Sequence, residues 1–157
     1  MIEPINDFAN LFRTSIHLNE NLVAKQQNRC FLLTGTLKKL ASRGFSYAGT
    51  YLGKTANGRF FPSLELLRMI AKEKANNVVV DKRTEWLFIC GRDVFKQGII
   101  KVVGSYKRGD YVLILNRHGE CLGYGRIVDD LSKGKERMVI KNILDIGDFL
   151  RREKDEP

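Results

Sequence analysis

The sequence has few of the residues that hold metal ions or form disulfides. Only two histidines and three cysteines occur among its 157 residues. The cysteines, Cys30, Cys90 and Cys121, lie far apart within apolar runs and show no Cys-x-x-Cys spacing. No zinc site or disulfide framework is therefore predicted. We expect all three cysteines to be small buried hydrophobic residues in a reducing compartment, and we expect neither a metal nor a cofactor.

Long apolar runs and a basic N-terminal segment are also missing. No run approaches the roughly 20 residues that a membrane-spanning helix needs, and no basic amphipathic helix stands out. Glu3 and Asp7 stand where a signal peptide would carry basic residues and a long apolar run. We therefore expect a cytoplasmic protein with no membrane partner.

Acidic residues are scarce relative to basic ones. The 27 lysines and arginines exceed the 18 acids by nine charges, and the pI is near 9.6. An excess of this size is typical of chains that contact polyanions, and nucleic acid is the first candidate. Some proteins carry the same excess without binding a polyanion, so charge alone leaves both interpretations open.

Candidate catalytic residues are few in the first half. Asp7, His17 and Cys30 are the only aspartate, histidine and cysteine among residues 1–77, so a nucleophile with a nearby base is hard to assemble. The segment 49–55, GTYLGKT, resembles a phosphate-binding loop but has three residues between its glycines where that motif has four. No helix is expected directly after it, although the motif requires one. We predict a hairpin turn over 56–58 there and no catalytic residue.

Helical and β-type patterns alternate in the first half. Apolar residues at helical spacing predict a helix over residues 4–18. Two strands, 22–23 and 30–33, are expected around a turn at 26–28, followed by a short helix that Thr36 caps and Gly44 ends. A strand over 47–52 and a helix opened by Pro62 and Ser63 complete this half.

Closely spaced β-type runs dominate the second half. The apolar run Trp86–Cys90 is long enough for a buried strand and too short for a helix, which would place Trp86 and Phe88 in the core. Asp93 is expected to cap a helical turn that carries Val94 and Phe95 and ends at Gly98. Further strands are predicted over residues 99–103, 111–115, 122–128 and 138–143.

These patterns predict an α+β fold in two parts. Residues 1–77 would form a mixed α/β domain, and residues 78–157 a small, mostly antiparallel barrel. The boundary is placed near Asn77 because helical periodicity gives way there to closely spaced strands. Each half alone would be marginally stable, so we expect the two to pack together.

Three motifs in the second half resemble the PUA domain, an RNA-binding pseudo-β-barrel. They are Phe88-x-x-Gly91-x-Asp93-Val94-x-x-x-Gly98-Ile99, Lys107-x-Gly109-Asp110-x-Val112 and Gly123-x-Gly125. Further segments are similar to the archaeal branch of the Nip-seven family of large-ribosomal-subunit biogenesis factors, namely Gly49-Thr50-x-x-Gly53-Lys54, Arg59-Phe60 and 145–151. The resemblance runs from about Ser46 to Glu153, and it implies a protein without known catalytic activity that prefers uridine-rich RNA.

The resemblance also implies where RNA would bind. PUA domains typically use the helical turn, the glycine loop after it and the last strand and helix. The corresponding RNA-binding candidates are Arg92, Lys96, Gly98, Lys101, Arg151, Arg152 and Lys154. We expect the apolar segment 146–150 to anchor Arg151 and Arg152 at their base and leave both guanidinium groups free. The alternative for each cation is an ordinary solvated surface charge.

Three functional hypotheses follow. The first is a non-catalytic factor in rRNA processing and large-subunit assembly that binds single-stranded, uridine-rich RNA of the pre-rRNA or pre-ribosome through residues 78–157. The second is an RNA-modifying enzyme, or its accessory subunit, with a PUA substrate-binding domain. The third makes residues 1–77 a docking module for the exosome or other assembly proteins, and it can coexist with the first.

Overall fold

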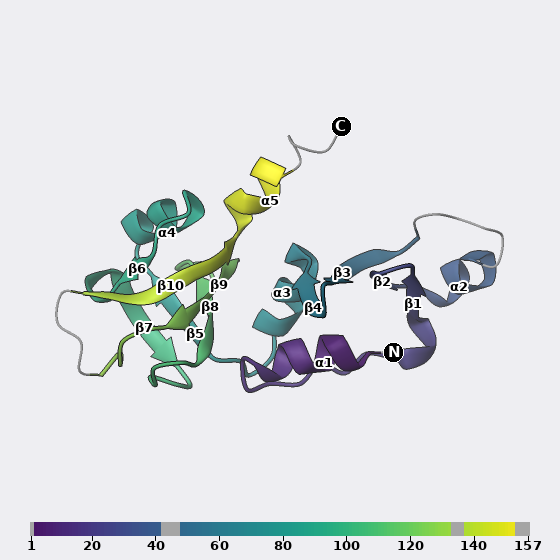
Figure 1. Ribbon diagram of the computed structural model, residues 1–157, viewed down its shortest axis with the longest axis horizontal. Coiled ribbons are helices and arrows are strands. Elements are labelled where there is room, and N and C mark those ends of the chain that lie inside the picture. The colour runs from purple at the N-terminus through teal and green to yellow at the C-terminus, as the bar shows by residue number, and fades with distance from the viewer. Residues whose placement is uncertain (1, 42–47, 133–136, 153–157) are drawn as a thin grey trace.

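The chain contains two β-sheets at opposite ends of an elongated molecule, with helices α1 and α3 between them (Figure 1). The computed structural model describes residues 2–41, 48–132 and 137–152. The first sheet is antiparallel, in the order β1-β2-β3-β4. Its strands are β1 (Val23–Gln26), β2 (Arg29–Leu32), β3 (Thr50–Ala56) and β4 (Arg59–Pro62).

The second sheet has the order β6-β10-β9-β8-β5-β7, and every pair is antiparallel except β5 with β8. Its strands are β5 (Asn77–Val80), β6 (Val94–Phe95), β7 (Ile99–Val103), β8 (Tyr111–Leu115), β9 (Cys121–Ile127) and β10 (Met138–Asp145). The expected strands from residue 99 onward therefore occur within two residues of their predicted bounds. The predicted α+β class is confirmed.

The helices differ more from expectation. They are α1 (Glu3–Asn10), α2 (Gly35–Ala41), α3 (Leu64–Ala71), α4 (Lys82–Ile89) and α5 (Ile146–Arg152), with single 3-10 turns at Glu20–Leu22 and Lys96–Gly98, the latter labelled η2. Helix α1 ends eight residues before the predicted position, and Arg13 has a positive φ of 55° that no helix continues through. Ile16 is still buried, but irregular backbone carries it into the core.

Side-chain hydrogen bonds define the first residues of helices α2 and α3. Thr34, and not the predicted Thr36, caps α2 by accepting a hydrogen bond from the backbone N–H of Leu37 at 3.2 Å. Ser63 caps α3 as expected, with its hydroxyl accepting from Leu66 N–H at 3.1 Å. Gly44 and the first residue of the predicted strand at 47–52 lie outside the described residues, and β3 runs further, to Ala56.

The predicted strand Trp86–Cys90 is wrong, because Trp86–Ile89 form the second half of helix α4 and Cys90 is the residue that follows it. Asp81 begins this helix by accepting a hydrogen bond from Thr84 N–H at 2.7 Å. Thr84 and Phe88 lie one turn apart and face the core, whereas Trp86 lies on the opposite side and is 69% exposed. The core placement is therefore confirmed for Phe88 and wrong for Trp86.

The predicted helical turn after Gly91 is displaced along the chain. Val94 and Phe95 form strand β6, which pairs with β10, and the helical turn is η2 at Lys96–Gly98. Asp93 caps no helix. Its carboxylate instead accepts a hydrogen bond from the backbone N–H of Asn142 at 2.8 Å, which ties β6 to β10.

The segment that resembles a phosphate-binding loop lies in a β-hairpin. Gly53 and Lys54 are within β3 and pair with Pro62 and Phe61 of β4. The hairpin turn that follows contains Asn57, whose φ is 50°, and Gly58. Because a strand follows in place of a helix N-terminus, the backbone amides are not directed at a phosphate. The structure confirms the predicted hairpin.

The apolar core consists of two clusters, and the first of them contains residues of both sheets. It joins Phe8, Phe12 and Leu52 to Leu113 and Tyr124, whereas the second lies within the six-stranded sheet beneath α4. The domain boundary near Asn77 stays a prediction. The structure places β1 to β4 before this position and begins β5 at it.

The cysteine expectation needs one correction. Cys30 and Cys121 are buried as predicted, but Cys90, the residue that follows α4, is exposed. Among the residues that the structure describes, no group of His, Cys, Asp and Glu could hold a metal ion. None of the helices in these same ranges is long and apolar enough to cross a membrane.

Candidate nucleic-acid interface

Helix α4 covers the six-stranded sheet at the end of the molecule remote from β1 to β4 (Figure 1). Its first turn is fastened to η2. Gly98 lies against Thr84 so closely that a methyl group at position 98 would overlap the threonine hydroxyl. The carbonyl of Gly98 accepts a hydrogen bond from Asp81 N–H at 2.9 Å. Gly98, a predicted RNA-binding residue, is therefore buried, and its visible role is to let α4 and η2 approach.

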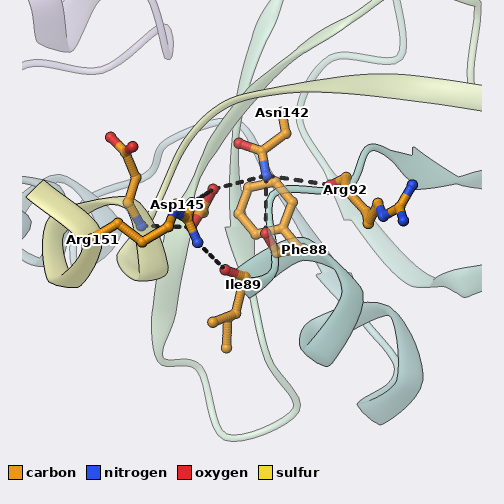
Figure 2. A network of polar contacts seen from close by, with 7 residues as sticks. Phe88, Ile89, Arg92, Asn142, Asp145 and Arg151 are labelled. Atoms are coloured by element: carbon orange, nitrogen blue, oxygen red, sulfur yellow. Dashed lines mark hydrogen bonds and ion pairs between the residues drawn. The ribbon is translucent and has the colours of Figure 1, made fainter.

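The C-terminal end of α4 is held by the side chain of Asn142 (Figure 2). Carbonyls at a helix end have no partner within the helix and need external donors. The Asn142 amide donates to the carbonyls of Phe88, at 3.0 Å, and Arg92, at 3.3 Å. It also donates to the carboxylate of Asp145 at 3.2 Å. Asn142 stands at an irregularity in the pairing of β10 with β9, which turns its side chain toward α4.

Arg151 of α5 completes this network. Its guanidinium pairs with Asp145 at 3.2 Å and donates to the carbonyl of Ile89 at 3.3 Å. Asp145 is only 3% exposed, so the arginine neutralises a buried carboxylate. The expectation that the Arg151 guanidinium is free is thus wrong. The side chains of Arg152 and Lys154 lie outside the described residues, and their contact with RNA stays a prediction.

Three predicted cations lie around the ends of α4, η2 and the neighbouring edge strand. Arg92 follows α4 and is exposed, with its side chain directed away from the Asn142 network (Figure 2). Lys96 opens η2, and Lys101 is exposed on β7, at the edge of the sheet. None of the three forms an ion pair with an acidic residue in the described part of the chain. They are available to bind an anionic ligand.

An open cavity of about 430 Å³ adjoins this edge strand. It is lined by Val79 of β5, Ile100 and Lys101 of β7, and Asn116, Arg117 and Gly119 of the turn between β8 and β9. The cavity therefore combines two apolar side chains with two cations. A surface of this kind can accept a flat, partly apolar group that carries negative charge nearby.

Two further cations on α4, Lys82 and Arg83, were missed by sequence reasoning. Both are exposed. The signal that could have found them is Asp81, because aspartate is a favoured helix cap and a helix beginning there places residues 82–90 on a helical surface. The pKa of the Asp81 carboxyl is lowered mainly by the hydrogen bond from Thr84 N–H, with smaller contributions from Arg117 and Arg83.

Comparison with known proteins places the second half in a defined family. The model of the UPF0113 PUA domain matches residues 76–154. A UPF0113 protein of Archaeoglobus fulgidus is 33% identical over 112 residues, which cover 69% of this chain and 63% of that protein. A glutamate 5-kinase of Aquifex aeolicus is 32% identical over 80 residues, which cover 47% of this chain but 22% of the enzyme. The chain thus spans less than two thirds of either relative.

The fold is also similar to that of a solved protein. The structure of a conserved PUA domain protein from Thermoplasma acidophilum superposes with a TM-score of 0.56 at 24% sequence identity, covering 83% of this chain and 79% of that one. The family match begins one residue before β5 and includes the whole six-stranded sheet with α4. It also includes the Asn142 network and the cations Arg92, Lys96 and Lys101. On this match the chain belongs to the UPF0113 PUA domain family.

Proposed function

We propose that this chain is a non-catalytic RNA-binding factor that holds single-stranded RNA on its PUA half. PUA domains generally bind RNA. The observation that carries the proposal for this chain is a set of cations without acidic partners among the described residues, namely Arg92 after α4, Lys96 on η2 and Lys101 on β7. Close packing of Gly98 on Thr84 and the hydrogen bond from Asn142 to the Phe88 carbonyl hold η2 and the end of α4, so the backbone that carries Arg92 and Lys96 is ordered before RNA binds.

The proposed binding is mainly electrostatic. Lysine and arginine side chains hold phosphate oxygens and fix the register of the strand, but such contacts carry no base information. Unpaired bases are recognised separately, by stacking or by hydrogen bonds to their edges. The net charge of +9 would speed the approach of RNA and make its affinity depend on salt.

The cellular role is proposed from the resemblance to the Nip-seven family. We infer that the RNA is a uridine-rich segment of pre-rRNA or of a pre-ribosome, bound in the cytoplasm during assembly of the large subunit. Residues 1–77 would then be free to contact the exosome or other assembly proteins. Crosslinking in cells followed by sequencing of the bound RNA tests this role, and recovery of tRNA alone would contradict it.

The proposal assigns no catalytic residue. Among the described residues of the first half, the one cysteine, Cys30, is buried, and burial raises the pKa of its thiol. A protonated, inaccessible thiol is a poor nucleophile. The competing hypothesis of an RNA-modifying enzyme would be supported if the purified protein formed a modified nucleotide on rRNA or tRNA.

Salt dependence tests the binding surface. Each phosphate contact on a single strand contributes about 0.7 to the slope of log K against log salt. Replacing Arg92, Lys96 and Lys101 together by alanine should reduce the magnitude of that slope by about 2. The loss should be similar for uridine-rich and mixed sequences, because phosphate contacts do not distinguish bases. Fluorescence anisotropy of a labelled 20-nucleotide RNA between 50 and 200 mM salt measures both quantities.

A control variant removes the same charge from the N-terminal half. Lys38, Lys54 and Arg59 belong to α2, β3 and β4 and are replaced together by alanine. This variant should keep most of the wild-type slope, since a general effect of net charge would be small beside lost contacts. The opposite result would be a smaller slope of log K against log salt in the control variant and an unchanged slope in the first variant. RNA would then bind the N-terminal half, and the proposed surface would be incorrect.

A further inference from the structure

Helix α4 presents the only tryptophan of the chain on its outer face. Trp86 is 69% exposed, the largest fraction among the large apolar side chains of the described residues. The buried Thr84 and Phe88 lie two residues before and after it, so the indole stands opposite the side that packs on the sheet. Single exposed apolar residues are common, so exposure alone assigns no role.

The surroundings of the indole are basic. Lys82 and Arg83 precede Trp86 by four and three residues, which places both on the same side of the helix. The two nearby acids are engaged elsewhere. Asp81 caps the helix, and Glu85 accepts a hydrogen bond from the side-chain amide of Asn116 at 3.2 Å. An exposed aromatic ring beside two cations complements a ligand that is both flat and anionic.

Both ends of α4 are fixed, so this surface is preorganised. The first turn is fastened through Asp81, Thr84 and Gly98, and the last carbonyls accept hydrogen bonds from Asn142 and Arg151. A ligand that binds here restricts only the ends of the side chains, because the helix is already ordered. The conformational entropy lost on binding is therefore small. Arg92, an exposed cation of the proposed RNA surface, follows the same helix, and its backbone N–H donates to the carbonyl of Leu87 at 3.0 Å.

We propose that Lys82, Arg83 and Trp86 form a stacking site for one unpaired RNA base, with the indole on the base and the two cations on the adjacent phosphates. This inference rests on the proposed function and adds a contact to a base, beyond the contacts to phosphates. Stacking on an aromatic ring tolerates every base, because each has a flat π-face. The site therefore contributes affinity for single strands and little discrimination between sequences.

The intrinsic fluorescence of Trp86 is a direct test, since no other tryptophan contributes. A base stacked on the indole should quench its emission in a saturable manner during titration with a uridine-rich oligonucleotide. An oligonucleotide of the same length with abasic positions keeps the phosphates, and heparin keeps only negative charge. Both should leave the emission almost unchanged.

Affinity gives a second readout. Trp86→Ala should weaken binding of labelled RNA by about 5- to 150-fold, the range measured for a lost base-aromatic stack. Trp86→Phe should restore most of the affinity. In Trp86→Ala the base-bearing and abasic strands should bind equally. Phe61→Ala is the matched control, because Phe61 is 38% exposed on β4 of the other sheet, and it should bind as the wild type does.

The outcomes separate this inference from the proposed function. If RNA binds the wild type with unaltered Trp86 emission, and Trp86→Ala binds equally well, the stacking site is refuted while RNA binding stands. If heparin or polyglutamate changes the emission as strongly as RNA does, the surface takes acidic partners generally and base stacking is refuted. If the wild type binds no RNA at low salt, both proposals fail.

Discussion

Phe88 and Trp86 lie two residues apart on α4 and have opposite surroundings. The phenyl ring is fully buried in the cluster beneath the helix, whereas the indole is mostly in water. Truncating a buried phenylalanine removes its contacts and leaves a cavity, at a cost of about 3 to 5 kcal/mol. A surface substitution without such contacts changes stability by about 0.5 kcal/mol or less.

We therefore predict that Phe88→Ala lowers the free energy of unfolding by about 3 to 5 kcal/mol and that Trp86→Ala leaves it nearly unchanged. Urea unfolding followed by circular dichroism measures both. Circular dichroism is needed because Trp86→Ala removes the only tryptophan. Similar large losses in the two variants would mean that both rings are in the core, as in the strand that the sequence suggested.

Three basic residues near α4 and the six-stranded sheet show how much the sequence alone can predict about a single side chain. Arg92 and Lys101 are exposed cations, which agrees with their selection as RNA-binding candidates from the resemblance to PUA domains. Arg151 could not be assigned correctly, because its partner Asp145 and its acceptor Ile89 become neighbours only when β10 meets α4. The sequence shows charge and spacing, but it does not show which charges neutralise one another.

At the level of elements, α4 shows why an apolar run of five residues is ambiguous. Trp86–Cys90 fits a strand and also the last turns of a helix, and length alone cannot decide between them. The polar residues 82–85 decide, because they form the first turn after the Asp81 cap. The strands β7 to β10 were predictable since turn residues bound each of them on both sides.

The Asp81 cap leads to a prediction about pH. Replacing a capping aspartate by alanine costs about 0.5 to 2 kcal/mol, so Asp81→Ala should lower stability by that amount at pH 7. Because the folded-state pKa of Asp81 is lowered, its carboxylate contributes stability above its unfolded pKa of about 3.9. That contribution is lost as pH falls through the folded-state pKa.

Urea unfolding between pH 7 and pH 3 checks this expectation. The difference in stability between the wild type and Asp81→Ala should narrow below about pH 4. Asp81→Asn is the control, because asparagine is an equally good cap that does not titrate. Its stability relative to Asp81→Ala should stay constant across the range. A wild-type advantage that is equally large at pH 7 and pH 3 would contradict the role of the charged cap.

At the level of the whole molecule, an aromatic group connects the two sheets. Phe8 and Phe12 from the first residues of the chain pack against Tyr124 of β9, each with ring centroids 5.5 Å from it and near-perpendicular planes. Arg13 adds an ion pair to Asp110 at 2.9 Å, but an exposed pair contributes little. The sequence predicted that the halves pack together. It could not show which rings meet, because the partners are more than 100 residues apart.

Tyr124 makes this junction sensitive to alkaline pH. Burial, with a smaller contribution from Tyr111, raises the pKa of Tyr124 to about 12. A raised pKa means that the folded state favours the protonated phenol, so its contribution to stability is complete below the unfolded pKa of about 10. This contribution is lost as pH rises from there to about 12. Burial raises the pKa of Cys121 to about 11, so its thiol adds to the same loss.

We predict that Tyr124→Phe, which keeps the ring contacts and removes the titrating hydroxyl, unfolds less readily than the wild type as pH rises from 10 to 12. Urea unfolding in a Cys121→Ala background isolates the phenol from the thiol. The matched control is Tyr106→Phe, since Tyr106 is 46% exposed and lies outside the aromatic group. In the Cys121→Ala background, this variant should show the same dependence of the free energy of unfolding on pH as the background itself. If Tyr124→Phe also keeps that dependence, alkaline unfolding begins elsewhere and the aromatic junction is not the point at which the two sheets separate.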